Sequence, residues 1–476
     1  MKIHNVRLGY ATNSSSSHSI IFDPSIGMNH DDADDFGWNF FTASTRESKD
    51  EYMASMLRQN LDGDFPQAMI DAIIKGLDLP DDTDGCYGGK HIDHQSLYNL
   101  PTEFGSDHVS LEFFNEFRNY ILQDGIHILG GNDNCDDGHH LLNGNKVNFG
   151  GWEPERGDMV CRKDGDWWTL YSKHTGNRIV LTFNDNAAPY APVTPMLMDI
   201  KITDFCTHGC AYCYQGSSKA GEHMNSKELW SYAGMVAEAK VFEVAIGGGE
   251  PTQCPQFEDY IRMLHDQGVI VNFTTKSTDW LEDEKRCEAI LKYTGAFAFS
   301  VDDATLPKLD RVYDILKYRG YNGYGKEKLT LQVVPATISA YQLERILNWA
   351  AMHHIRVTLL GYKESGRGAK FKEIGLAKSW GKFNEGEWLG TVAKLNKEKK
   401  LGRLSIDTTL ASKYEAELKE LGLPEWLYHT KEGQYSMYLD LVQLKYGPSS
   451  YHVDKLVPFD LHRISVEEMF AKVEPV

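Results

Sequence analysis

The sequence predicts an α/β protein in which a partial (β/α)6 barrel lies between an N-terminal α+β domain and a C-terminal capping extension. After residue 195, short apolar segments rich in β-branched and aromatic residues alternate with segments of helical periodicity. The six predicted strands are 196–203, 242–248, 269–275, 296–302, 329–335 and 355–361. Alternating strands and helices indicate a parallel sheet with right-handed crossovers, and six such units make an open or partial barrel.

The segment 225–240 shows how the helices between these strands are recognised. Asn225 is suited to cap its start, and Glu228 occupies the capping-box position three residues later. The apolar residues that follow fall on one helical face. We therefore expect a helix that covers the sheet between the first two strands.

Proline-rich residues 184–195 separate this region from the N-terminal part, because prolines break helices and restrict their neighbours. We expect an N-terminal α+β domain over 1–190, which presents substrate or acts as a lid, and the barrel over 195–370. In the N-terminal domain we expect helices near 51–60, 66–76 and 110–122, and strand-like segments between 159 and 183.

The C-terminal extension, 371–476, contains a predicted strand hairpin at 433–452 that we expect to cap the barrel. No cysteine follows Cys287, so the extension contributes no cysteine ligand to a metal or cluster.

Composition excludes several classes of function. The 476-residue chain has a net charge of −19 and no long run of lysine or arginine, which argues against a nucleic-acid polymer as partner. No stretch approaches about 18 consecutive apolar residues, so no membrane span is expected. The N-terminal residues lack the apolar core of a secretory signal, and we expect a cytoplasmic protein.

Three of the eight cysteines, Cys206, Cys210 and Cys213, fall within eight residues directly after the first predicted strand. Ligands of α/β folds gather at this end of the strands. A [4Fe–4S] cluster normally takes four thiolates, so three leave one iron open, as a catalytic zinc site leaves one position open. Structural zinc, with His208 or a distant residue as fourth ligand, is the alternative interpretation.

A second motif, GGGEPT at 247–252, ends the second predicted strand. Its glycines allow a ligand to approach the backbone closely. Glu250 offers a fixed carboxylate suited to an ammonium group, and Pro251 stiffens the turn. A glycine-rich loop alone is also typical of an ordinary tight turn. Its position about one βα unit after the cysteines makes the combination of the two motifs a specific signal.

Together the two motifs resemble those of the radical S-adenosylmethionine (radical SAM) superfamily. Its members carry CxxxCxΦC, with Φ aromatic, after the first barrel strand and a GGEP-type motif after the second. Tyr212 stands at Φ, and Gly248, Gly249, Glu250 and Pro251 form the second motif. The resemblance covers about 195–370.

The resemblance implies a [4Fe–4S] cluster held by the three cysteines and SAM bound at the open iron. It implies that Glu250, with the backbone of Gly248 and Gly249, holds the methionyl ammonium, and that Tyr212 lies near the adenine. By strand position, further SAM or substrate contacts are expected at Thr274 or Thr275, Ser300, Val334 or Ile338, and Leu360 with Gly361.

Of these positions, Leu360 ends the sixth predicted strand, where members of the family often pass the adenine. Ser300 and Asp302 also fit a plain strand end that caps the next helix. Lys363, Glu364 and Arg367 follow on a loop above the barrel, where they either bind substrate or are simply solvated.

Cys254 lies four residues after Glu250, which suggests a hydrogen-atom donor to a substrate radical; a small buried thiol is the alternative. Cys86, Cys135 and Cys161 stand in clusters that either bind a metal, although their spacing matches no established metal-binding pattern, or form polar turns. The serine-rich residues 13–19 fit either an anion-binding turn or ordinary caps.

The resemblance implies an oxygen-sensitive enzyme that cleaves SAM reductively to a 5′-deoxyadenosyl radical and abstracts hydrogen from its substrate. We expect a small polar metabolite or a peptide side chain as substrate, and a reducing partner such as flavodoxin or ferredoxin. Two alternatives are radical modification of a nucleotide or nucleic acid, and a non-enzymatic zinc or iron–sulfur protein.

Overall fold

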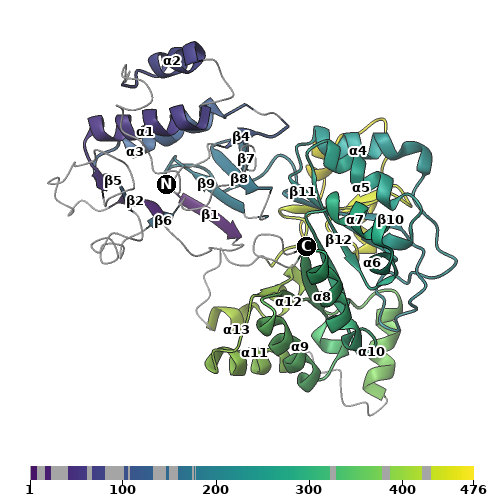
Figure 1. Ribbon diagram of the computed structural model, residues 1–476. Helices are drawn as coiled ribbons and strands as arrows, with labels where there is room; N and C mark the ends of the chain where they lie inside the picture. Colours follow the sequence, from purple (N-terminus) through teal and green to yellow (C-terminus); the bar gives the residue numbers. More distant parts are fainter. Residues whose placement is uncertain are drawn as a thin grey trace. The chain divides into compact units, whose positions relative to one another are not determined.

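The computed structural model divides the chain into two compact units, residues 1–190 and 191–476 (Figure 1). The structure describes residues 2–7, 17–22, 41–61, 67–80, 101–105, 108–131, 146–148, 159–173, 176, 178–321, 328–377, 386–420 and 430–476. Among them, no helix combines the length and the apolar character needed to cross a membrane.

The first unit is α+β, as predicted, and its described residues form two sheets. The five-stranded sheet has the order β1 (Lys2–Arg7), β9 (Arg178–Thr182), β8 (Trp167–Ser172), β7 (Met159–Asp164) and β4 (Thr102–Glu103). The four-stranded sheet has the order β3 (Phe41–Ala43), β5 (Ile126–Gly131), β2 (Ser17–Phe22) and β6 (Lys146–Asn148). The helices are α1 (Arg46–Leu61), α2 (Gln67–Gly76) and α3 (Leu111–Ile121), which confirms the three predicted helices.

Helix α3 shows how this unit packs. Ser110 caps its start by accepting a hydrogen bond from the Phe113 N–H. Phe113 and Phe117 lie on its buried face, and the Phe113 ring meets the Trp168 ring edge-on at 5.3 Å between centroids. The helix therefore contributes its aromatic face to the core of the first unit.

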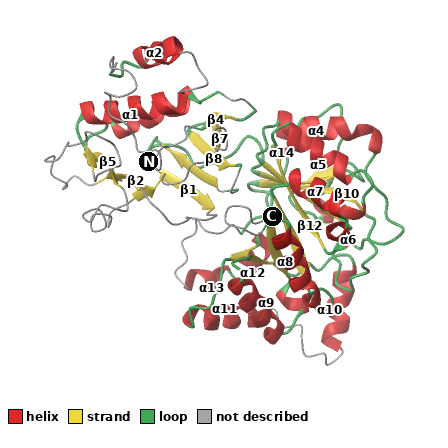
Figure 2. Cartoon of the chain, in the orientation of Figure 1, coloured by secondary structure: helices red, strands yellow, loops and turns green. Residues whose placement is uncertain are grey.

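The second unit is built on a sheet whose strands are drawn in yellow in Figure 2. The described residues give this sheet ten strands. Its order is β16 (Leu404–Ile406), β15 (Arg356–Leu359), β14 (Leu329–Val333), β13 (Ala296–Val301), β12 (Ile270–Thr275), β11 (Glu243–Gly248), β10 (Leu197–Thr203), β17 (Ser436–Asp440), β18 (Lys445–Gly447) and β19 (Val457–Pro458). The first eight strands in this order pair in parallel, and β18 and β19 pair antiparallel.

The six predicted barrel strands are confirmed as β10 to β15. The structure adds β16 and β17 to the two ends of this parallel array, so part of 371–476 belongs to the sheet itself. The predicted hairpin is β17 with β18, and its first strand pairs with β10.

Helices connect the strands of the second unit. They are α4 (Leu229–Glu238), α5 (Phe257–Asp266), α6 (Asp279–Glu282), α7 (Glu284–Lys292), α8 (Leu309–Tyr318), α9 (Ala340–Met352), α10 (Arg367–Ala377), α11 (Glu387–Lys397), α12 (Thr408–Lys413), α13 (Glu415–Glu420) and α14 (Val466–Phe470). Asn225 caps the short 3-10 turn before α4 by accepting a hydrogen bond from the Lys227 N–H.

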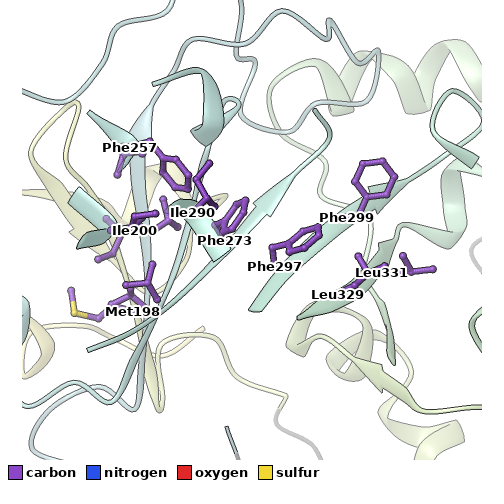
Figure 3. Packing of buried hydrophobic residues seen from close by; sticks show 14 of the residues in the cluster. Met198, Ile200, Phe257, Phe273, Ile290, Phe297, Phe299, Leu329 and Leu331 are labelled. Atoms are coloured by element: carbon purple, nitrogen blue, oxygen red, sulfur yellow. The ribbon is translucent and has the colours of Figure 1, made fainter. Parts of the chain in front are cut away.

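Alternation along the strands gives the sheet two different faces. In β12, Phe273 is buried in the apolar core, and in β13 so are Phe297 and Phe299 (Figure 3). The neighbouring Thr274 and Ser300 line a cavity instead. Because successive side chains of a strand point to opposite faces, one face packs on the helices and the other is left for polar residues.

Candidate active site

A cavity of about 570 Å³ lies where the parallel strands end. Most of the residues selected from the sequence line it. They are Cys206, Cys210, Tyr212, Cys213, Gly248, Gly249, Glu250, Thr274, Ser300, Val334 and Leu360. These residues come from five βα connections and the cysteine loop, so the parallel topology gathers them at one edge of the sheet.

The three clustered cysteines follow β10 on a loop whose backbone is extensively hydrogen-bonded. The Cys206 N–H donates to the Ser218 carbonyl at 3.0 Å, and the Cys213 N–H donates to the Cys210 carbonyl at 3.2 Å. All three thiols are free and partly exposed. Burial raises the pKa of the Cys206 thiol. Three thiols facing one cavity suit an iron–sulfur cluster, for which thiolates are the usual ligands.

Arg367, the first residue of α10, holds this loop in place. Its side chain donates hydrogen bonds to the carbonyls of Cys210, at 2.9 Å, Gly216, at 3.0 Å, and Ser217, at 2.8 Å. Its backbone N–H donates to the Cys213 carbonyl at 2.9 Å. The guanidinium is therefore committed to positioning the cysteine loop, which neither of the two sequence interpretations of Arg367 anticipated. Glu364, from the same segment, pairs with Lys372 at the surface.

The glycine loop packs directly on the backbone of the cysteine loop. The Gly249 N–H donates to the Thr203 carbonyl at 2.7 Å. A Cβ on Gly248 would lie 2.4 Å from the Thr203 carbonyl oxygen, and a Cβ on Gly249 would lie 2.1 Å from that of Phe205. Gly248 also has a φ of +116°, which side chains rarely adopt. Both glycines are thus required by contact within the chain itself.

Glu250 is buried, with 1% of its surface exposed, and accepts hydrogen bonds through both carboxylate oxygens. Its donors are the Thr252 hydroxyl at 2.7 Å and N–H at 3.3 Å, the Thr275 hydroxyl at 2.7 Å, the Lys276 N–H at 2.9 Å and the Ser277 N–H at 3.2 Å. Burial alone would raise its pKa, but the interactions with His208 and with the donors of Lys276, Thr275 and Thr252 outweigh burial and hold the pKa below its usual value.

This arrangement gives Glu250 a structural task besides any contact with a ligand. Its carboxylate joins the loop after β11 to the loop after β12. His208 Nε2, from the cysteine loop, lies 3.3 Å from the same carboxylate. The position of Pro251 fits this picture, since it opens the short 3-10 turn that Glu250 caps and is itself buried.

The sequence interpretation missed a charged group beside the cysteines. Lys276, directly after β12, donates from Nζ to the Cys210 sulfur at 3.2 Å and to the Asp302 carboxylate. The Tyr212 hydroxyl donates to the same carboxylate at 2.6 Å. A lysine following the third strand, in line with the other strand-end residues, is the signal that would have found it.

A second charged group lines the cavity away from the cysteines. Lys363 Nζ lies 4.9 Å from the ring centroid of Tyr214 and 4.9 Å from that of Tyr451. Burial raises the pKa of Asp199 to about 6 and that of Glu432 to about 7, while Lys363 lowers both. The β17 region and the residues after β18 therefore contribute directly to the cavity wall.

The position of Cys254 does not fit the sequence hypothesis that this residue donates a hydrogen atom. Its thiol is 2% exposed, belongs to the apolar core and does not line the cavity. Its sulfur lies 3.3 Å from Gln256 Oε1, and burial raises its pKa to about 11. A donor must reach the substrate radical, so the alternative of a small buried thiol describes this residue.

For the remaining residues selected from the sequence, burial shows whether they line the cavity, or they lie outside the described residues. Thr274 and Thr275 both line the cavity, although Thr275 is buried. Ile338 is buried and is not part of the lining, whereas its alternative Val334 is. Cys161 is a buried thiol in β7. Cys86, Cys135 and most of the serine-rich segment 13–19 are outside the part of the chain that the structure describes. Among the described residues, no group of three His, Cys, Asp or Glu side chains is arranged around a single metal ion.

Comparison with known proteins identifies the region that carries the cysteine loop and the glycine loop. Residues 200–328 match the family model described as the radical SAM superfamily. No curated protein matches the chain.

Two similar solved structures are SuiB of Streptococcus suis bound to the precursor peptide SuiA, and anSMEcpe with bound AdoMet and the Cp18Cys peptide. SuiB is 14% identical with a TM-score of 0.47, and the match covers 66% of this chain and 87% of SuiB. For anSMEcpe the identity is 16% and the TM-score 0.40, with coverage of 58% and 80%.

Proposed function

The chain belongs to the radical SAM superfamily, and we propose that its cavity binds SAM beside the cysteine loop and holds a polar substrate for hydrogen abstraction. Members of this superfamily are enzymes that use a [4Fe–4S] cluster and SAM, and the match of residues 200–328 makes this chain one of them. The observation that carries the proposal is the convergence of the three cysteines and the glycine loop on one cavity.

In this proposal Cys206, Cys210 and Cys213 hold the cluster, and no fourth cysteine of the described chain lines the cavity. When bound, the cluster supplies the electron for reductive cleavage of SAM, and the resulting 5′-deoxyadenosyl radical abstracts the substrate hydrogen. The residues of the chain position these partners. Arg367 fixes the cysteine loop, and the Glu250 network fixes the neighbouring turns.

SAM contacts are proposed for the strand-end residues that line the same cavity. Thr274 and Ser300 offer hydroxyl groups, and Val334 and Leu360 offer apolar surface for the adenine. The methionyl ammonium is proposed to meet the Gly247–Glu250 turn. Because Glu250 already accepts several hydrogen bonds from the chain, backbone carbonyls of this turn are the more accessible acceptors.

The substrate is proposed to be a small polar metabolite or a peptide side chain. Support comes from the charged wall formed by Asp199, Glu432 and Lys363, which an apolar substrate would desolvate without offering any hydrogen bond in return. A reducing partner such as flavodoxin or ferredoxin would supply the electron. A nucleotide remains compatible with such a wall, and family membership disfavours a non-enzymatic zinc protein.

The test compares the wild type with Cys210→Ala after anaerobic reconstitution with iron and sulfide. Both proteins are incubated with SAM and dithionite, and 5′-deoxyadenosine is quantified. We expect formation by the wild type alone. A wild type that takes up zinc and no cluster, or that holds cluster and SAM yet forms no 5′-deoxyadenosine, would contradict the proposal.

A further inference from the structure

Lys276 is held beside Cys210, one of the three proposed cluster ligands, by residues that follow the neighbouring strands. Its Nζ donates to the Cys210 sulfur at 3.2 Å and to Asp302, which follows β13. Its backbone N–H donates to Glu250, which follows β11, at 2.9 Å. The lysine head group is thus held at the cysteine loop from both its main chain and its side chain.

The Asp302 carboxylate is itself held in place by hydrogen bonds from the backbone. Its Oδ1 accepts hydrogen bonds from the N–H groups of Ala304, at 3.0 Å, and Thr305, at 3.2 Å. Its Oδ2 faces Lys276 and the Tyr212 hydroxyl. The side chains of Lys276 and Asp302 are 15% and 10% exposed, so water screens this pair only weakly.

A fixed ammonium group beside a thiolate sulfur acts on the redox chemistry of that ligand. Hydrogen bonds to cluster sulfurs and the local net charge set the reduction potential of iron–sulfur clusters. A positive charge stabilises the reduced cluster, which carries one more negative charge, and therefore raises the potential. A carboxylate at the same place has the opposite effect.

We propose that Lys276 is a positioning residue that raises the reduction potential of the cluster through the Cys210 sulfur. Asp302 keeps Lys276 in contact with that sulfur and offsets part of its charge. This inference rests on the proposed function, because it requires the cluster on the three cysteines. The one-electron reduction involved takes its electron from dithionite in the experiment below.

The experiment measures the midpoint potential of the cluster by anaerobic titration with dithionite, followed by electron paramagnetic resonance, on the full chain without SAM. Four variants are compared with the wild type: Lys276→Met, Lys276→Arg, Asp302→Asn and Lys201→Met. Lys201 is the matched control, since this buried lysine of the same cavity pairs with Asp204 and Asp440 at 2.6 and 2.9 Å and with no cysteine. Iron and sulfide content is determined for every sample.

We expect a lower midpoint potential for Lys276→Met, a value close to the wild type for Lys276→Arg, and a higher one for Asp302→Asn. Lys201→Met is expected to shift the potential less than Lys276→Met. A fully loaded Lys276→Met with the wild-type potential, or an equal shift in Lys201→Met, would overturn the inference. If Lys276→Met loses its cluster, the neutral Lys276→Gln takes its place, and a wild-type potential in that loaded variant overturns the inference.

Failure of the inference is distinct from failure of the proposed function. A wild type that holds the cluster and is reduced at a potential insensitive to Lys276 refutes only the role of this lysine. A wild type that assembles no cluster refutes the proposed function first.

Discussion

The Arg367 side chain donates to the Cys210 carbonyl at 2.9 Å, which links residues 157 positions apart in the sequence. One arginine thereby ties the start of α10 to the loop that carries the three cysteines. Because its other hydrogen bonds also end on carbonyls of this loop, Arg367 contributes to the shape of the loop and not to an open substrate pocket.

We predict that Arg367→Ala destabilises the second unit by ~2 kcal/mol or more, since hydrogen bonds from a charged group contribute about 1.5–3 kcal/mol. Iron content after reconstitution should fall several-fold, because the cysteines lose their fixed spacing. Thermal unfolding and iron analysis measure both effects. Arg367→Lys should restore only part of the stability and iron content, since lysine lacks the planar guanidinium group that reaches several carbonyls. Wild-type iron content in the alanine variant would contradict this role.

The glycine loop allows a matched pair of variants. Gly249→Ala places a methyl group 2.1 Å from the Phe205 carbonyl oxygen, which the backbone can relieve only by moving the cysteine loop. Gly247→Ala meets no atom within 4 Å. We expect Gly249→Ala to lower the melting temperature and the iron content, and Gly247→Ala to leave both near wild type. Equal behaviour of the two variants would show that packing does not require Gly249.

Glu250→Gln should destabilise the protein at neutral pH by ~3 kcal/mol, because the amide replaces a charged acceptor and turns an N–H₂ group toward existing donors. The wild-type pKa of Glu250 is lowered in the fold. Its stabilising contribution is therefore present above the unfolded pKa of about 4.3 and is lost as the pH falls through the lower folded value. Urea unfolding at pH 7 and pH 3.5 measures this. A difference between the two proteins that stays constant with pH would contradict the prediction.

Glu432 should produce the opposite pH dependence. Burial, together with Asp199 and Asp407, raises its pKa to about 7, so the folded state binds more protons than the unfolded state between about pH 4.5 and 7. The contribution of Glu432 to the free energy of unfolding therefore falls as the pH rises through that window. We expect Glu432→Gln to flatten the decline by on the order of 1–2 kcal/mol between pH 5 and pH 8, allowing for partial exposure. Denaturant unfolding at the two pH values checks it, and an unchanged slope would exclude Glu432 as its source.

The barrel strands were predictable because their signal is local. Six apolar segments separated by helical ones specify β10 to β15, and the cysteine and glycine motifs lie at strand ends, where parallel topology brings ligand-binding residues together. The strands β16 and β17 were not assigned to the barrel, since Leu404–Ile406 is only three residues long and β17 pairs with a strand more than 200 residues earlier.

By itself the sequence determined the alternation of strands and helices, the three cysteines at one strand end, and the family resemblance they carry. Only the tertiary structure decided that Cys254 is buried, that Arg367 serves the cysteine loop, and that Lys276 meets Cys210. The physical reason is that the motifs are set by short spacings along the chain. Burial and hydrogen-bond partners instead depend on which distant strands become neighbours, and no local pattern specifies that.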